Sequence, residues 1–236
     1  MAFSVDATSS GTTTGSSSAQ ITVTQTHVVG ATANWLFVMV SYGGNGSGGT
    51  PTLVAPTWNG TSMTLIANYI PGSLGAGGDY LAVYGLSNPA TGSHSIVTKW
   101  TPNSTASISW LGTTGISFIG AAVTQSGAVT GSGEQGNSTY SNGVATNKAN
   151  SIVIGWSYSS SSGGQSLTGT NSLTTVNNGN FSGVSNRQFA CAYQTTTSTG
   201  TYDYNVSLTG GSGIDSGLIE VEAGAVAANG KFLAFM

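Results

Sequence analysis

The sequence predicts an all-β protein: an antiparallel two-sheet β-sandwich, jelly-roll-like or Ig-like, with about a dozen strands. Residues that favour strands and turns dominate, with 35 Ser, 33 Thr and 36 Gly against only 5% charged residues. Short apolar or alternating runs are separated by turn residues along the whole chain, and no stretch has convincing helical periodicity. Hydrophobic residues make up 38% of the chain and the net charge is only −3, a combination that indicates a packed core and not a disordered chain.

The strands follow from this punctuation. Residues 21–24 alternate between apolar and polar, whereas residues 35–40 are continuously apolar and predict a central strand that is covered on both faces. Asn59-Gly60 predicts a type I′ hairpin turn, because both residues tolerate positive φ. The remaining expected strands are 63–67, 80–86, 93–100, 107–111, 115–123, 151–158, 189–195, 202–208 and 218–226.

The chain divides into a short N-terminal segment and a body. Residues 7–19 are a polar, low-complexity stretch typical of a flexible linker. We therefore expect residues 1–19 to form an extended arm, in which Ala2, Phe3, Val5 and Asp6 would contact a neighbouring subunit. Residues 20–236 are expected to form a single β-sandwich domain, and no internal repeat is visible in them.

Charge, cysteine content and targeting signals limit the partners. Four basic residues cannot form the basic surface that nucleic acid or an anionic membrane requires. Cys191 is the only cysteine, which excludes an intramolecular disulfide and a cysteine zinc site and indicates a core residue. The N-terminus has no secretion signal, and the longest apolar run, residues 35–40, is too short for a membrane span. A hydroxyl-rich, exterior-type composition without an export signal predicts a virion protein assembled in the host cytoplasm.

A resemblance adds to this interpretation. Residues 56–158 contain, in order, Thr57-Trp58-Asn59-Gly60-Thr61-Ser62-Met63, Tyr84-Gly85-Leu86-Ser87-Asn88-Pro89-Ala90-Thr91-Gly92-Ser93-His94-Ser95-Ile96, Ser117-Phe118-Ile119-Gly120 and Ala149-Asn150-Ser151. This ordered set resembles a family of phage and bacterial surface β-sandwich proteins. The resemblance implies a sandwich fold and a virion or cell-surface setting of the capsid decoration, tail or fibre type. It implies no catalytic residue.

The sequence indicates no catalytic, cofactor-binding or metal site. His27 and His94 are the only histidines, and no nucleophile, metal or phosphate-loop motif accompanies them. Glu220 and Glu222 are two residues apart, so on a strand they share one face, a spacing that could suit glycoside chemistry. The alternation of Ile219, Val221 and Ala223 instead predicts that both glutamates point outward into solvent. Acidic residues that could bind Ca²⁺ do not form a calcium-loop motif.

The leading hypothesis is a non-enzymatic bacteriophage virion structural protein, a capsid decoration or cement protein or a tail or fibre component. It would assemble as a homo-oligomer and contact other virion proteins. The alternative is a carbohydrate-binding or adhesion module that contacts a host-surface glycan through Trp58, Trp100 and Tyr140, if these aromatic side chains are exposed. The third hypothesis is a glycoside-acting enzyme that uses Glu220 and Glu222.

Overall fold

The computed structural model describes residues 3–16, 20–45, 52–69, 80–101, 108–122, 124–134, 138–161 and 164–224. The described residues form 17 β-strands in four antiparallel sheets, and none of them is helical. The predicted all-β antiparallel sandwich fold is confirmed, with more strands than the expected dozen and with four sheets instead of two.

The first half of the chain builds two of these sheets. The five-stranded sheet has the order β1-β9-β3-β7-β6 and is called the first inner sheet; the four-stranded sheet has the order β2-β8-β4-β5 and is called the first outer sheet. The strands are β1 Ser4–Ser16, β2 Ile21–Val29, β3 Ala33–Asn45, β4 Thr52–Trp58, β5 Thr61–Ser62, β6 Thr64–Tyr69, β7 Tyr80–Ser87, β8 Gly92–Thr101 and β9 Ile108–Ile119.

The second half builds the other two sheets. The five-stranded sheet, β10-β17-β12-β15-β14, is the second inner sheet, and the three-stranded sheet, β11-β16-β13, is the second outer sheet. The strands are β10 Val129–Glu134, β11 Thr139–Ala145, β12 Ile152–Ser161, β13 Gln165–Gly169, β14 Thr174–Asn180, β15 Gln188–Thr195, β16 Thr201–Leu208 and β17 Gly211–Val221.

The two halves have the same strand order. Replacing β1, β2, β3, β4, β6, β7, β8 and β9 by β10 to β17 in sequence converts the first pair of sheets into the second, with only β5 left over. Matching hydrogen bonds follow: the Asn88 amide donates to the Asn34 carbonyl (2.8 Å), and the Thr196 amide donates to the Ser151 carbonyl (2.9 Å). The single sandwich expected for residues 20–236 is therefore two sandwiches of one topology. The repeat lies in strand order and not in residue identity, so the sequence does not reveal it.

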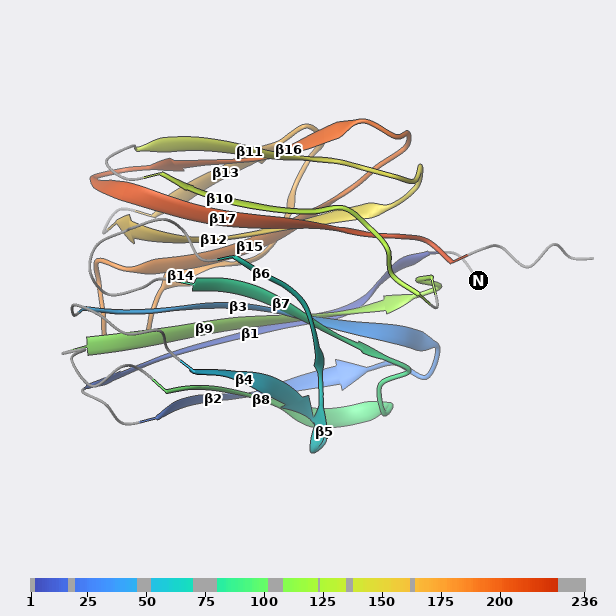
Figure 1. Ribbon diagram of the computed structural model, residues 1–236, viewed down its shortest axis with the longest axis horizontal. Coiled ribbons are helices and arrows are strands. Elements are labelled where there is room, and N and C mark those ends of the chain that lie inside the picture. The colour runs from blue at the N-terminus through green and yellow to red at the C-terminus, as the bar shows by residue number, and fades with distance from the viewer. Residues whose placement is uncertain are drawn as a thin grey trace, which may run out of the picture.

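The four sheets stack as layers, with the two inner sheets face to face and the outer sheets at opposite ends (Figure 1). Phe37 and Phe118 from one half pack with Trp156 and Phe189 from the other to form the central core. Each sandwich also has a core of its own between its inner and outer sheets. The halves have an approximate two-fold relationship, because β1 contacts β14 in the same way that its counterpart β10 contacts β6.

Burial in the strands follows from this layering. In β3, which lies in an inner sheet, residues 36–43 are all buried, as the continuously apolar run predicts. In β2, which lies in an outer sheet, buried and exposed residues alternate strictly. The predicted hairpin turn is also confirmed, since Asn59 and Gly60 have φ values of 46° and 78°.

The N-terminal segment differs from the expected arm. Residues 4–16 form β1, which pairs with β9 from Ser4 opposite Ile119 to Ser16 opposite Ile108 and is an edge strand of the first inner sheet. Its glycines are close-packing positions: a Cβ at Gly11 would lie 2.9 Å from Val23, and a Cβ at Gly15 would collide with Ile21. Glycine and hydroxyl residues are typical of a linker. In this fold the same residues allow β1 to pack closely against the first outer sheet.

Candidate functional site

Asp6 anchors β1 to the rest of the first sandwich. It sits where the pairing of β1 with β9 shifts register between Val5 and Ala7. Its Oδ2 accepts hydrogen bonds from the Gly30 amide and from the Ser117 hydroxyl, both at 2.8 Å. Any Cβ at residue 30 would run into this carboxylate, so the turn between β2 and β3 requires glycine here. The carboxylate thus joins three segments that are far apart in the sequence.

A buried hydrogen-bond chain continues from Ser117 through His27. The Ser117 hydroxyl donates its proton to Asp6, so it must accept at 3.1 Å from Nε2–H of His27. Nδ1 of His27 is then unprotonated and accepts from the Ser9 hydroxyl at 2.8 Å, and Ser9 in turn accepts from the Gln25 amide at 3.2 Å. Every donor in this chain has an acceptor when His27 is neutral.

His27 is held in this neutral form. Only 1% of the residue is exposed, and burial lowers the pKa of the imidazole from its ordinary value of 6.5 to about 4, although the nearby Asp6 charge acts in the opposite direction. The serine, histidine and aspartate that could suggest a catalytic triad are therefore closed off from substrate and bonded to one another. Their arrangement holds β1, β2 and β9 together.

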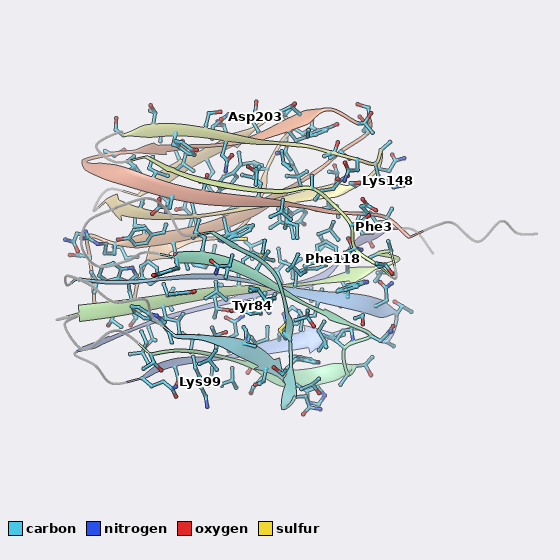
Figure 2. All side chains as sticks on the ribbon, in the orientation of Figure 1. Phe3, Tyr84, Lys99, Phe118, Lys148 and Asp203 are labelled. Atoms are coloured by element: carbon cyan, nitrogen blue, oxygen red, sulfur yellow. The ribbon has the colours of Figure 1, made fainter. Side chains whose placement is uncertain are left out.

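Glu220 forms the corresponding anchor in the second sandwich. Its carboxylate accepts hydrogen bonds from the Asn147 amide (2.7 Å), the Lys148 amide (3.0 Å) and the Ser151 hydroxyl (2.7 Å). These residues belong to the turn between β11 and β12. Lys148 lies at the same end of the molecule as Phe3, which directly precedes β1 (Figure 2). The carboxylate therefore pins this turn onto β17.

The outward, solvated positions predicted for Glu220 and Glu222 are wrong. Glu220 is fully buried and Glu222 is 4% exposed, and Glu222 also accepts from the Ser126 hydroxyl at 3.2 Å. The alternation argument assumed that one face of the strand meets water. β17 lies in an inner sheet that is covered on both faces, which buries Glu220, and Glu222, which follows β17, is covered by Gln125 and Ser126.

The two anchors occupy matching places. Ser117 is paired with Leu36, and Glu220 is paired with Val153 at the matching position of the matching strands. The turn amide bound by the carboxylate also matches, being that of Gly30 in the first sandwich and that of Asn147 in the second. In each half, a carboxylate thus accepts a hydrogen bond from a backbone amide of the same turn. The carboxylate belongs to β1 in the first half and to β17 in the second.

The aromatic side chains predicted to contact glycans are not available for stacking. Trp58 is fully buried and donates its indole N–H to the Ala90 carbonyl (3.0 Å), and Trp100 is 2% exposed. Tyr140 is half-buried and packs against the core of the second sandwich. No aromatic side chain among those described is exposed, because the layered fold uses its large rings to fill the three cores. Trp58, Trp100 and Tyr140 therefore do not form a sugar-binding platform.

The residues expected in an assembly arm belong to the body. Phe3 stacks on Phe118 with ring centroids 5.9 Å apart, and Val5 packs against the central core. Asp6 is the anchor described above, and Ala2 lies outside the described residues. No motif in the sequence indicates a structural role for Ser9, Gln25 or Gly30, and Ser117 stands out only as part of the resemblance. The alternation of β2 was the available signal, because it places Gln25 and His27 on the same buried face as Ile21 and Val23.

The described residues contain no group of three or more His, Cys, Asp or Glu side chains that could hold a metal ion. Among the same residues, no helix is long and apolar enough to cross a membrane. Neither a protein-family model nor a curated protein sequence matches the chain, so the resemblance to phage and bacterial surface proteins stays a prediction.

Proposed function

We propose that this chain is a non-enzymatic structural protein of a bacteriophage particle, a capsid decoration or cement protein or a component of a tail or fibre. It assembles through contacts with copies of itself and with neighbouring virion proteins. The observation that carries the proposal is the use of the reactive side chains: His27, Glu220 and Cys191 are all buried inside the fold. The first two hold strands and turns in place, which is the work of a scaffold.

The outer sheets supply surfaces suited to assembly. Thr22, Thr24 and Thr26 point outward from β2, and Ser141 and Thr168 are exposed on the second outer sheet. Hydroxyl groups lose less on desolvation than ions do, so neutral surfaces of this kind can be covered by a neighbour without an ion-pairing partner. Interfaces between them would be bridged by water.

The resemblance of residues 56–158 to phage and bacterial surface sandwiches supports a place in a particle. The segments that carry it fall on structural features of the first sandwich and of the start of the second, including the hairpin turn at Asn59-Gly60 and the turn between β7 and β8, in which Asn88 and Gly92 have positive φ. These are positions that a sandwich needs for its fold, so they support the architecture and the setting and not a reaction.

The test is to look for the chain in particles. Particles would be purified on a density gradient from a lysate of the phage or lysogen that encodes the chain, treated with nuclease, and analysed by quantitative mass spectrometry and immunogold labelling. We expect a fixed copy number per particle and labelling at one structural location. Recovery of the chain only in the soluble fraction, away from intact particles, would refute the proposal.

A further inference from the structure

The edges of the two inner sheets meet at a seam between β6 and β10. A groove of about 250 Å³ runs along this seam. Ala67 of β6 and Val129 of β10 lie on its two sides, and Leu81, Trp156 and Gly217 contribute from the strands beneath. We refer to this feature as the β6/β10 seam.

Two exposed apolar side chains lie at the β6/β10 seam. They are Ile66 (37%) of β6, on the face of that strand that also carries Ala67, and Val129 (39%) of β10. A third exposed apolar side chain among the described residues, Leu65 (44%), also belongs to β6 but pairs with Tyr84 of the first sandwich core, so it lies on the opposite face. The fourth, Val28, lies on β2 in the first outer sheet. Single exposed apolar side chains are ordinary on a protein surface, but a cluster beside a groove indicates a contact surface.

Hydrogen-bonding groups without a partner lie beneath the groove and along its edges. Trp156 is 2% exposed, and its indole N–H has no acceptor among the described residues, a state that is costly for a buried donor. β6 and β10 are edge strands, each paired on one side only, so each presents backbone N–H and C=O groups along its open side. An occupant of this groove therefore needs carbonyl acceptors as well as apolar side chains, which is the chemistry of a peptide segment.

At the opposite seam, the corresponding edges of the inner sheets are joined by hydrogen bonds. The approximate two-fold relationship places β1 and β14 where β10 and β6 lie on the other side. There the Thr14 hydroxyl donates to the Ser182 carbonyl at 2.6 Å, and the Ser182 amide donates to the Thr12 hydroxyl at 3.3 Å. No such cross-seam hydrogen bond joins β6 to β10 among the hydrogen bonds of the described residues.

We propose that the β6/β10 seam binds an apolar peptide segment, and that this segment is residues 231–236 of a second copy of the chain. The sequence there is Lys-Phe-Leu-Ala-Phe-Met, with four large apolar side chains and no acidic residue. The groove residues are themselves uncharged, so the segment buries no ion pair against them. The 12 residues that follow Gly224 could span at most about 40 Å, which is enough to reach an adjacent molecule.

This inference rests on the proposed function, because it names the contact by which copies of the chain join. Phenylalanine and leucine side chains of the segment would cover Val129 and Ile66. Pairing of the segment with an open strand edge would add backbone hydrogen bonds. The hydroxyl-rich outer sheets would then remain free for other virion proteins.

The test uses the full chain and four variants. Size-exclusion chromatography with light scattering would measure the mass of the wild type, Val129→Asp, Ile66→Asp, Phe232→Ser/Phe235→Ser and Val28→Asp across a range of concentrations. Val28→Asp is the matched control, because it adds the same charge at the exposed valine far from the seam. Circular dichroism and thermal unfolding would verify that each variant is folded. A fluorescent peptide with the sequence of residues 229–236 would then be titrated into the Phe232→Ser/Phe235→Ser variant, whose own segment cannot compete.

We expect the wild type and Val28→Asp to self-associate, and the three other variants to have an apparent Kd for self-association raised at least about tenfold. The peptide should bind the Phe232→Ser/Phe235→Ser variant, and binding should fall by a similar factor when Val129→Asp is added. A wild type that is monomeric throughout, a peptide that does not bind, or a Val28→Asp variant that loses association equally would overturn the proposal. None of these results would bear on whether the chain is found in particles, so the proposed function would be judged separately.

Discussion

Acidification should weaken the fold through one residue, His27. The unfolded chain binds a proton at this imidazole near pH 6.5, whereas the folded chain resists it until about pH 4. Between these values the unfolded state holds more protons, so the free energy of unfolding falls as the pH falls, and below about pH 4 this contribution is gone. The separation of the two pKa values corresponds to about 3 kcal/mol.

The physical cause lies in the hydrogen-bond chain. A proton added at Nδ1 of His27 would point at the hydroxyl proton of Ser9, so the Ser9 O–H would have to rotate away and lose its imidazole acceptor. The added charge would also be buried. Segment β1 should loosen first, because it is attached through Ser9 and Asp6 and none of its described side chains is fully buried.

The assay is urea unfolding followed by tryptophan fluorescence at several values between pH 4 and pH 7.5. Carboxylates also titrate in the acidic part of this range, so the informative quantity is the difference between the wild type and His27→Gln, which cannot take up the proton. The wild type should lose about 3 kcal/mol more than His27→Gln between pH 7 and pH 4. His94→Gln, which leaves the chain of hydrogen bonds intact, should behave as the wild type does. Equal pH slopes for the wild type and His27→Gln would refute the reasoning.

Three further outcomes test the interior. Glu220→Ala should lower the free energy of unfolding by about 1–3 kcal/mol for the buried donors left without an acceptor, and should speed amide hydrogen exchange in residues 146–151. Gly112→Ala should lower the free energy of unfolding by about 1–3 kcal/mol, because its Cβ would lie 2.8 Å from a phenylalanine ring. Gly179→Ala, which has open space around the position, should change this free energy by less than about 0.5 kcal/mol. Urea titrations would measure both. Burial raises the pKa of the Cys191 thiol, so it should react with a disulfide reagent only after unfolding; rapid reaction of the native protein would contradict its placement in the core.

The fold class could be predicted because composition and local punctuation act at short range. Residues 36–40 form the buried centre of β3 because a continuous apolar run has no other stable position, and Asn59-Gly60 takes positive φ because few other residues do so at low cost. These inferences need only neighbouring residues. They do not depend on which sheet covers which.

The parts that failed depend on packing at long range. Glu220 looked solvated because its strand alternates, and only the presence of a layer on each side of β17 reverses that conclusion. Gly11 and Gly15 looked like linker residues because the side chains of Val23 and Ile21, against which they fit, belong to another sheet. The hydrogen-bond chain of His27 includes residues from three strands, so no spacing within the sequence predicts it.

The doubled sandwich gives the molecule a direction. Its two ends are the outer sheets, which share a topology but not a surface: one has four strands and presents a row of threonines, and the other has three and is lined by serine, threonine and asparagine. A true two-fold dimer of a single sandwich would present the same face at both ends and could not distinguish one neighbour from another. Because a single chain joins the two halves, each end can differ in its surface chemistry, and under the proposed function the two ends would contact unlike neighbours.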